Sequence, residues 1–119
     1  MILVDTSVWI EHLRAGSAPL AGLLLESEVL VHPFVVGELA CGHLNNRREV
    51  LALLDRLPAS RVARDAELRY FIESSRLMGR GIGFVDAHLL AAVALTPGSL
   101  LWTGDRRLAG IAADLGFAY

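Results

Sequence analysis

The sequence contains no lysine, and all 11 of its basic residues are arginine. This absence excludes functions that need a lysine amine, such as P-loop nucleotide hydrolysis, Schiff-base catalysis and pyridoxal-phosphate chemistry. The single cysteine, Cys41, cannot form an internal disulfide or a CxxC site, so nothing indicates an oxidising compartment. No apolar run approaches the roughly 18 residues of a membrane span, and Asp5 comes too early for a signal peptide. We therefore expect a cytoplasmic protein without a membrane segment.

The chain also carries little net charge, −2 from 11 basic and 13 acidic residues. Bulk electrostatics therefore predicts no general attraction to nucleic acid or anionic lipid, and any such contact must be local. Apolar residues make up 54% of the 119 positions, enough to bury a core, but the length leaves no room for a second one. We expect a single domain over residues 1–119.

Three short apolar runs are typical of strands buried on both faces. They comprise Ile2–Val4, Val29–Val31 and Leu100–Trp102. Helical periodicity predicts helices over about 6–15, 18–26, 33–40, 47–57, 66–78, 84–95 and 106–115, and short further strands are expected over 60–63 and 116–118. Buried strands that alternate with helices indicate a three-layer α/β/α sandwich around a parallel sheet. The pattern does not give the order of the strands.

Three local signals refine the expected helix ends. Asn46 and Glu49 have the spacing of a capping box, and Asp65 is placed to cap the following helix. Met78 continues the apolar face of that helix, before the glycines at 79, 81 and 83 end it.

Four acidic residues fall at the same edge of this predicted sheet. In an open parallel sheet the functional crevice lies beyond the carboxyl ends of the strands. Asp5 and Asp105 follow the first and last main strands, and Glu38 lies one turn into the helix after the second. Asp86 lies in the first turn of the helix that follows the glycine-rich loop. We expect the four carboxylates to converge.

Each acid also has a purely structural interpretation. Taken singly, Asp5 and Asp105 are expected to serve as N-caps, because aspartate is a preferred cap at a strand-to-helix junction. Glu38 and Asp86 have apolar neighbours on both sides, which predicts that they face the protein rather than solvent. An unpaired buried carboxylate is costly, so these two positions favour a function.

A cluster of carboxylates needs a positive partner. Two unit charges 4 Å apart repel by about 4 kcal/mol at an effective dielectric constant near 20. Since lysine is absent, arginine or a divalent cation must compensate, and a site made only of acidic oxygens suits Mg²⁺ or Mn²⁺. Such an ion beside a phosphate can activate water for an in-line displacement, which predicts a metal-dependent phosphodiesterase.

Four segments together carry a family resemblance: Val4–Ile10, Val36–Leu39, Phe84–Ala87 and Leu101–Asp105. On these segments the chain resembles the PIN-domain ribonucleases over nearly its whole length, and more narrowly the VapC-type toxins of bacterial and archaeal toxin–antitoxin modules. The resemblance implies an endoribonuclease dependent on Mg²⁺ or Mn²⁺, with Ser7 and Thr103 as hydroxyl groups near the metal. It also implies a VapB-type antitoxin that holds the enzyme inactive, and a homodimer. Its acidic quartet would be Asp5, Glu38, Asp86 and Asp105.

Other polar residues allow more than one interpretation. Three arginines lie near the acids in sequence and are candidates for RNA phosphate contacts or for ordinary solvated side chains, namely Arg80, Arg106 and Arg107. The four histidines lack metal-ligand spacing, so we assign them structural roles. Trp9 and Trp102 stand in apolar stretches and are expected in the core.

Three hypotheses for the function remain. In the first, Asp5 and Asp86 chiefly bind the metal, Glu38 and Asp105 complete the charge, and activated water cleaves RNA. In the second, the same fold is a non-catalytic module that binds an antitoxin or nucleic acid, which retention of all four acids disfavours. In the third, Asp5 is the nucleophile of a phosphatase, which the missing lysine and the absence of an acid at Ser7 disfavour.

Overall fold

A computed structural model describes all residues 1–119. Its sheet has three parallel strands in the order β2-β1-β3, with β1 over Ile2–Val4, β2 over Val29–Leu30 and β3 over Leu100–Trp102. The first strand of the chain is thus the central one. Leu3 pairs with Leu30 on one side and with Leu101 on the other. Single parallel bridges extend the two edges, joining Val31 to Ala59 and Leu101 to Ala118.

Seven helices lie on the two sides of this sheet. They are α1 (Thr6–Ala15), α2 (Ala18–Leu25), α3 (Pro33–Cys41), α4 (Arg47–Arg56), α5 (Asp65–Ser74), α6 (Phe84–Leu95) and α7 (Arg106–Asp114). Of these, α5 packs against α6 rather than against the strands. None of them combines the length and the apolar character needed to cross a membrane.

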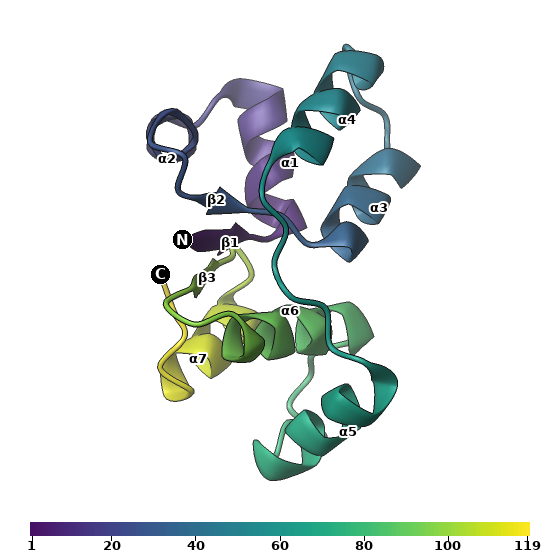
Figure 1. Cartoon of the computed structure of the whole chain (residues 1–119), viewed down its shortest axis with the longest axis vertical. Coiled ribbons are helices and arrows are strands. Elements are labelled where there is room, and N and C mark those ends of the chain that lie inside the picture. Colours follow the sequence, from purple (N-terminus) through teal and green to yellow (C-terminus); the bar gives the residue numbers. More distant parts are fainter.

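The direction of each crossover decides which face a helix covers. When the bridges at Ala59 and Ala118 are included, α1 to α4 belong to connections that step along the sheet in one direction. The connections that contain α5, α6 and α7 step in the other direction. Because parallel crossovers are right-handed, the two sets of helices lie on opposite faces. Figure 1 shows this arrangement, with α1 to α4 on one side of the strands and α5 to α7 on the other. The three-layer α/β architecture is confirmed.

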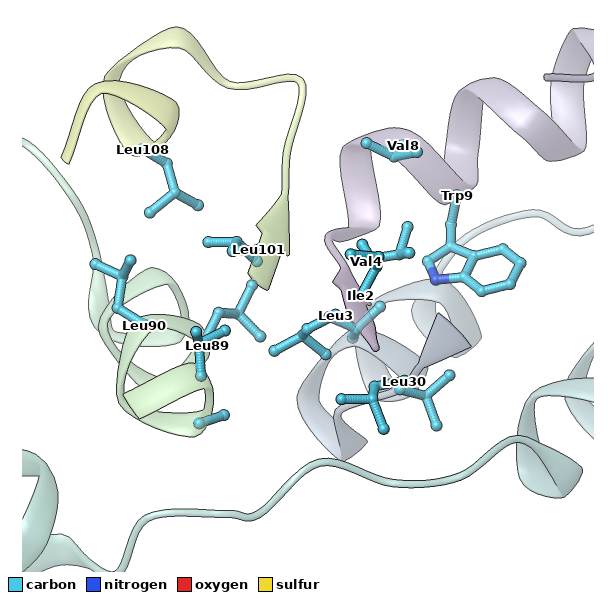
Figure 2. Packing of buried hydrophobic residues seen from close by; sticks show 14 of the residues in the cluster. Ile2, Leu3, Val4, Val8, Trp9, Leu30, Leu89, Leu90, Leu101 and Leu108 are labelled. Atoms are coloured by element: carbon cyan, nitrogen blue, oxygen red, sulfur yellow. The ribbon is translucent and has the colours of Figure 1, made fainter. Parts of the chain in front are cut away.

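The hydrophobic core extends through the sheet. Leu3 and Val4 of β1 have no exposed surface. Figure 2 shows the β1 side chains between Trp9 of α1 and the leucines of α6 and α7, including Leu89 and Leu108. Burial of each such side chain contributes about 1.5–3 kcal/mol. This packing holds the carboxyl ends of β1 and β3 in fixed positions, and Trp9, 1% exposed, is confirmed in the core. Trp102 is only half-buried, beside Tyr119.

Two expected helix caps are wrong. Asn46 makes no side-chain cap hydrogen bond, because its backbone is left-handed with φ 55°, a conformation that asparagine tolerates. Asp65 is not a cap but the first residue of α5, since Arg64 precedes the helix. The Arg64 amide donates to Glu67 Oε1 at 2.9 Å, so Glu67 satisfies this helix start in place of Asp65.

One expected strand is absent, another is reduced to a single bridge, and one expected core residue lies outside the core. The expected strand over 60–63 is wrong, because the bridge to Val31 is formed by Ala59 and the Arg61 amide donates to Thr96 Oγ1 rather than to a neighbouring strand. In the segment 116–118 only Ala118 forms a bridge. Met78 is 51% exposed, since α5 already ends at Ser74.

Candidate active site

Asp5 lies at the carboxyl end of β1 and is 7% exposed. Its Oδ1 accepts from the Thr6 amide at 2.7 Å, which caps α1, and its Oδ2 accepts from the hydroxyls of Ser7 at 3.2 Å and Thr103 at 2.7 Å. A carboxylate offers about four acceptor positions, and three are filled here. The buried charge is therefore well solvated by the protein and still retains capacity for one cation contact.

The loop after β3 is joined to the start of α1. The Gly104 amide donates to Ser7 Oγ at 3.0 Å, and the Asp105 amide donates to Thr103 Oγ1 at 3.0 Å. Asp105 Oδ1 accepts from the Leu108 amide at 3.0 Å and caps α7. One oxygen of Asp105 is thus used for capping, while the side chain stays exposed at the rim of the site.

Glu38 reaches the site from α3. Its Oε1 accepts from the hydroxyl of Thr6 at 2.6 Å, which links α3 to the start of α1. The expectation that Glu38 faces the protein is wrong, because the residue is exposed. Successive helical residues are rotated by about 100°, so the buried neighbour Leu39 does not determine the direction of Glu38. Thr6 is a site residue that the sequence interpretation missed, and its position directly after Asp5 was the available signal.

Asp86 occupies the first turn of α6 and is half-buried. Burial disfavours its charged form and raises the pKa of the Asp86 carboxyl. A long hydrogen bond of 3.5 Å from the Gly83 amide opposes this, while the negative charges of Asp5, Asp105 and Glu38 raise the pKa further. The four acids are therefore near enough to influence one ionisation, as expected from their common sheet edge.

None of the four acids forms an ion pair. The ion pairs of the chain use other carboxylates, in the pairs Met1–Glu28, Glu11–Arg14, Arg64–Glu67 and Arg80–Asp114. No three acidic, histidine or cysteine side chains are close enough to form a ready metal-binding group. The four acids are thus close enough for their charges to interact, but no three of them are close enough to bind one metal ion without rearrangement.

The three candidate arginines differ in their surroundings. Arg80 is paired with Asp114 at 2.8 Å, so an RNA phosphate would have to compete with that carboxylate for it. The guanidinium of Arg107 lies against Gly81, which has φ +83°, and a Cβ at that position would be 2.7 Å from Arg107 Cδ. Arg106 and Arg107 line an open hollow together with Gly81 and Asp105. Two cationic side chains thus stand beside one of the four acids.

Two histidines, His32 and His88, are buried between α3 and α6, in agreement with the structural roles expected for the histidines. His32 has no exposed surface, caps α3 by accepting from the Phe34 amide at 3.0 Å, and lies 6.0 Å from His88 of α6 between ring centroids. Burial, together with the charge of His88, lowers the pKa of His32 to about 4. Burial also lowers the pKa of His88, although the charge of Asp65 opposes that effect. Both rings are neutral packing groups at pH 7.

Comparisons with known proteins agree with this geometry. The PIN domain family matches residues 2–114 of the chain. Ribonuclease VapC32 of Mycobacterium tuberculosis, in strains CDC 1551 and H37Rv, is 50% identical over 118 residues. That alignment covers 99% of this chain and 95% of the relative. With four acids at the carboxyl edge of the sheet in a three-layer fold and a family match over nearly its whole length, the chain belongs to the PIN-domain family and is of the VapC type.

Proposed function

We propose that the protein is an endoribonuclease, dependent on Mg²⁺ or Mn²⁺, that acts in the cytoplasm as the toxin of a type II toxin–antitoxin module. Residues 1–119 form its single PIN domain. The observation that carries the proposal is the set of four carboxylates that share one sheet edge and form no ion pair, in which burial and the charges of the other three acids raise the pKa of Asp86. The name of the 50% identical relative, a ribonuclease, supports RNA as the substrate.

The donor set fits a hard divalent cation. All four groups offer carboxylate oxygens, and Asp5 retains an acceptor position after its three hydrogen bonds. Mg²⁺ keeps several waters and is commonly held by one or two carboxylates plus substrate phosphate. The absence of a preformed group of three ligands is compatible with this mode of binding. We assign the main metal contacts to Asp5 and Asp86, with Glu38 and Asp105 completing the charge.

When bound, the cation supplies Lewis-acid chemistry at a phosphodiester. The residues of the chain then divide the remaining tasks. The hydroxyls of Ser7 and Thr103 hold Asp5 in its orientation. Glu38 and Asp105 are exposed and each has one oxygen without a hydrogen-bond donor from the protein, so either can accept the proton of the attacking water.

Substrate binding is assigned to the hollow beside Asp105. Arg106 and Arg107 line it, and although Arg107 Nη1 donates to the Gly81 carbonyl at 3.5 Å, both side chains retain N–H groups that can donate to RNA phosphates. Arg80 also remains a candidate, but RNA would have to displace its ion pair with Asp114. Local contacts of this kind are needed because the net charge of −2 gives the protein no general attraction to RNA.

The partner we infer is a VapB-type antitoxin. An acidic cluster without a cationic partner attracts an arginine or lysine from another chain. A basic side chain inserted there would replace the cation and suppress cleavage. We also propose that the protein acts as a homodimer, as VapC-type proteins do by family resemblance.

Cleavage of purified RNA tests the proposal. The wild-type protein should cut single-stranded RNA with Mg²⁺ or Mn²⁺ and should not cut it with a chelator. Asp86→Asn should reduce cleavage by about 100-fold or more. The matched control is Asp55→Asn, an exposed acid on α4, which should cut like the wild type. Metal-independent cleavage, or an active Asp86→Asn protein, contradicts the site, and RNA binding without cleavage favours the non-catalytic module.

A second experiment tests the partnership. Co-expression with the product of the adjacent gene should yield a complex whose cleavage activity is suppressed. A protein that binds no such product, or that cuts RNA equally well in its presence, contradicts the toxin assignment.

A further inference from the structure

Phe84 is a large apolar side chain that remains exposed at the start of α6, the helix that carries the proposed catalytic residue Asp86. It is the first residue of α6, two positions before Asp86, and is 61% exposed. A single exposed apolar residue is common on protein surfaces and needs no explanation by itself. Two further observations indicate a function for Phe84: its ring is fixed in orientation, and the surfaces around it differ in chemistry.

The Phe84 ring is held in place by contacts with Phe34 and His88. Phe34 of α3 stacks against it, with the planes 25° apart and the centroids 6.4 Å apart. His88 meets it edge-on at 4.6 Å between centroids, and Phe34 also contacts His88 edge-on at 4.7 Å. Phe84 is therefore exposed yet fixed in orientation. An added flat ring would bind without having to order this side chain first.

Residues of the loop 79–83 line two hollows of different character. Ile82 borders an apolar hollow together with Met78 and Phe84. Gly81 lines the open hollow with Arg106 and Arg107. A nucleotide combines these two chemistries, because its base is flat and apolar on its faces while its phosphate is anionic.

We propose that Phe84 is a stacking platform for one unpaired base of the RNA substrate, next to the cleaved phosphate. This inference rests on the proposed ribonuclease function and adds a positioning residue to it. Proteins that recognise RNA by sequence or by single-strandedness commonly stack splayed bases on aromatic side chains. A paired base cannot reach the ring, so Phe84 makes the enzyme select single-stranded RNA.

Binding of a labelled single-stranded RNA of mixed sequence, compared with its duplex, tests the platform. The protein carries Asp86→Asn, so that the RNA stays intact in the presence of Mg²⁺. Phe84→Ala should weaken binding of the single strand by about 5- to 100-fold and leave duplex binding unchanged. Phe84→Trp should restore single-strand binding. Phe84→Leu, which is apolar but has no ring, should behave like alanine.

The matched control is Tyr70→Ala. Tyr70 is 74% exposed on α5 and lies against the carboxyl-terminal half of α6, at the other end from Phe84. Its removal should change neither binding nor cleavage. With Asp86 intact, Phe84→Ala should raise KM for single-stranded RNA more than it lowers kcat, because stacking positions the substrate rather than reacting with it.

The possible results separate this inference from the proposed function. Equal single-strand affinity of wild type and Phe84→Ala overturns the platform, and so does an equal loss for single strand and duplex. A Phe84→Ala protein that changes oligomeric state in sedimentation, without loss of RNA binding, assigns the ring to a protein interface instead. A wild-type protein that cuts no RNA but shows the Phe84-dependent binding refutes the nuclease and leaves the platform standing.

Discussion

The hydroxyl of Thr103 donates to Asp5 Oδ2 at 2.7 Å and joins two residues that are 98 positions apart in the chain. The same hydroxyl accepts from the Asp105 amide at 3.0 Å. One side chain after β3 therefore fixes the carboxylate at the end of β1 and the backbone of a second acid. The geometry of the site therefore depends on the pairing of β1 with β3, and not on either of the loops that follow these strands alone.

Thr103→Val removes that hydroxyl with little change of shape. The variant should lose about 1.5–3 kcal/mol of unfolding free energy, because it breaks a hydrogen bond to a buried charged group, and its cleavage should fall. Thr6→Val is the matched comparison, since it breaks a hydrogen bond to the exposed Glu38. Urea denaturation should show a smaller loss for Thr6→Val. Equal losses would mean that burial of Asp5 does not strengthen its contact.

Asp86→Asn should abolish cleavage without lowering the free energy of unfolding. A raised carboxyl pKa means that the folded state binds the proton more tightly than the unfolded state, so this stabilisation is lost as the pH rises through the folded-state pKa. At neutral pH the charged side chain is then a net cost. We expect the variant, measured in chelator, to be as stable as the wild type or more stable by about 1 kcal/mol.

The pH dependence provides the check on that expectation. The advantage of Asp86→Asn should shrink as the wild-type carboxyl becomes protonated towards about pH 4. A variant that loses about 1–3 kcal/mol at neutral pH would instead show that the Gly83 hydrogen bond is a structural one. The measurement is urea denaturation of both proteins across this pH range.

Mn²⁺ should bind weakly and depend on the acids. Calorimetry should detect uptake by the wild type, and Mn²⁺ at about 100 times its Kd should stabilise the fold by about 2.7 kcal/mol. The double variant Asp5→Asn, Asp86→Asn should lose both effects. Because Asp5 accepts three hydrogen bonds, this variant could unfold, so Asp86→Asn alone provides the second measurement. Undiminished Mn²⁺ uptake by a folded variant would rule out the assigned ligands.

Gly81→Ala and Gly79→Ala form a matched pair. Both glycines have positive φ, +83° and +70°, so each alanine should cost about 1–2 kcal/mol of backbone strain. Only at Gly81 would the new Cβ meet the Arg107 side chain, whereas Gly79 has open space around it. Gly81→Ala should therefore also weaken RNA binding, and Gly79→Ala should not. Equal RNA affinities would exclude Arg107 as a phosphate contact.

His32 should make the fold sensitive to acid. Its pKa is about 4 in the folded state and near 6.5 in the unfolded state, so the unfolded chain takes up the proton first as the pH falls. The contribution is complete above about pH 6.5 and is lost towards pH 4. Between about pH 7.5 and 4.5 the wild type should lose about 2 kcal/mol more stability than His32→Asn.

His32→Asn keeps a side-chain oxygen that can accept from the Phe34 amide, so the helix cap is retained. The variant starts less stable because the ring contacts with Phe34 and His88 are lost. The decisive quantity is therefore the difference between the two pH slopes, measured by urea denaturation. Parallel slopes would show that His32 is not the group that titrates.

The strands and helices could be predicted because each depends mainly on the residues within its own segment. Continuous apolar runs identified β1, β2 and β3, and helical spacing identified all seven helices within a few residues. The convergence of the four acids followed from one rule, since the carboxyl ends of parallel strands share one edge of a sheet. The roles of those acids in catalysis stay predictions.

Features that depend on tertiary contacts could not be predicted. Asp114 pairs with Arg80 over 34 positions, and no local pattern marks either residue for the other. Glu38 is exposed despite apolar neighbours, because the packing of α3 and not its composition decides which side faces solvent. Asn46 adopts a left-handed conformation because the turn before α4 requires one there. The order of the strands likewise depends on pairing partners that are distant in the chain.

The central position of β1 has a consequence for how the protein is made. In the finished sheet β1 is flanked by β3, which is synthesised almost 100 residues later. A nascent or truncated chain that ends before Leu100 contains Asp5, Glu38 and Asp86 but lacks the Thr103 hydroxyl that orients Asp5. Such a fragment cannot form the proposed site, so any activity that depends on this site can appear only after β3 and the loop that follows it have been synthesised.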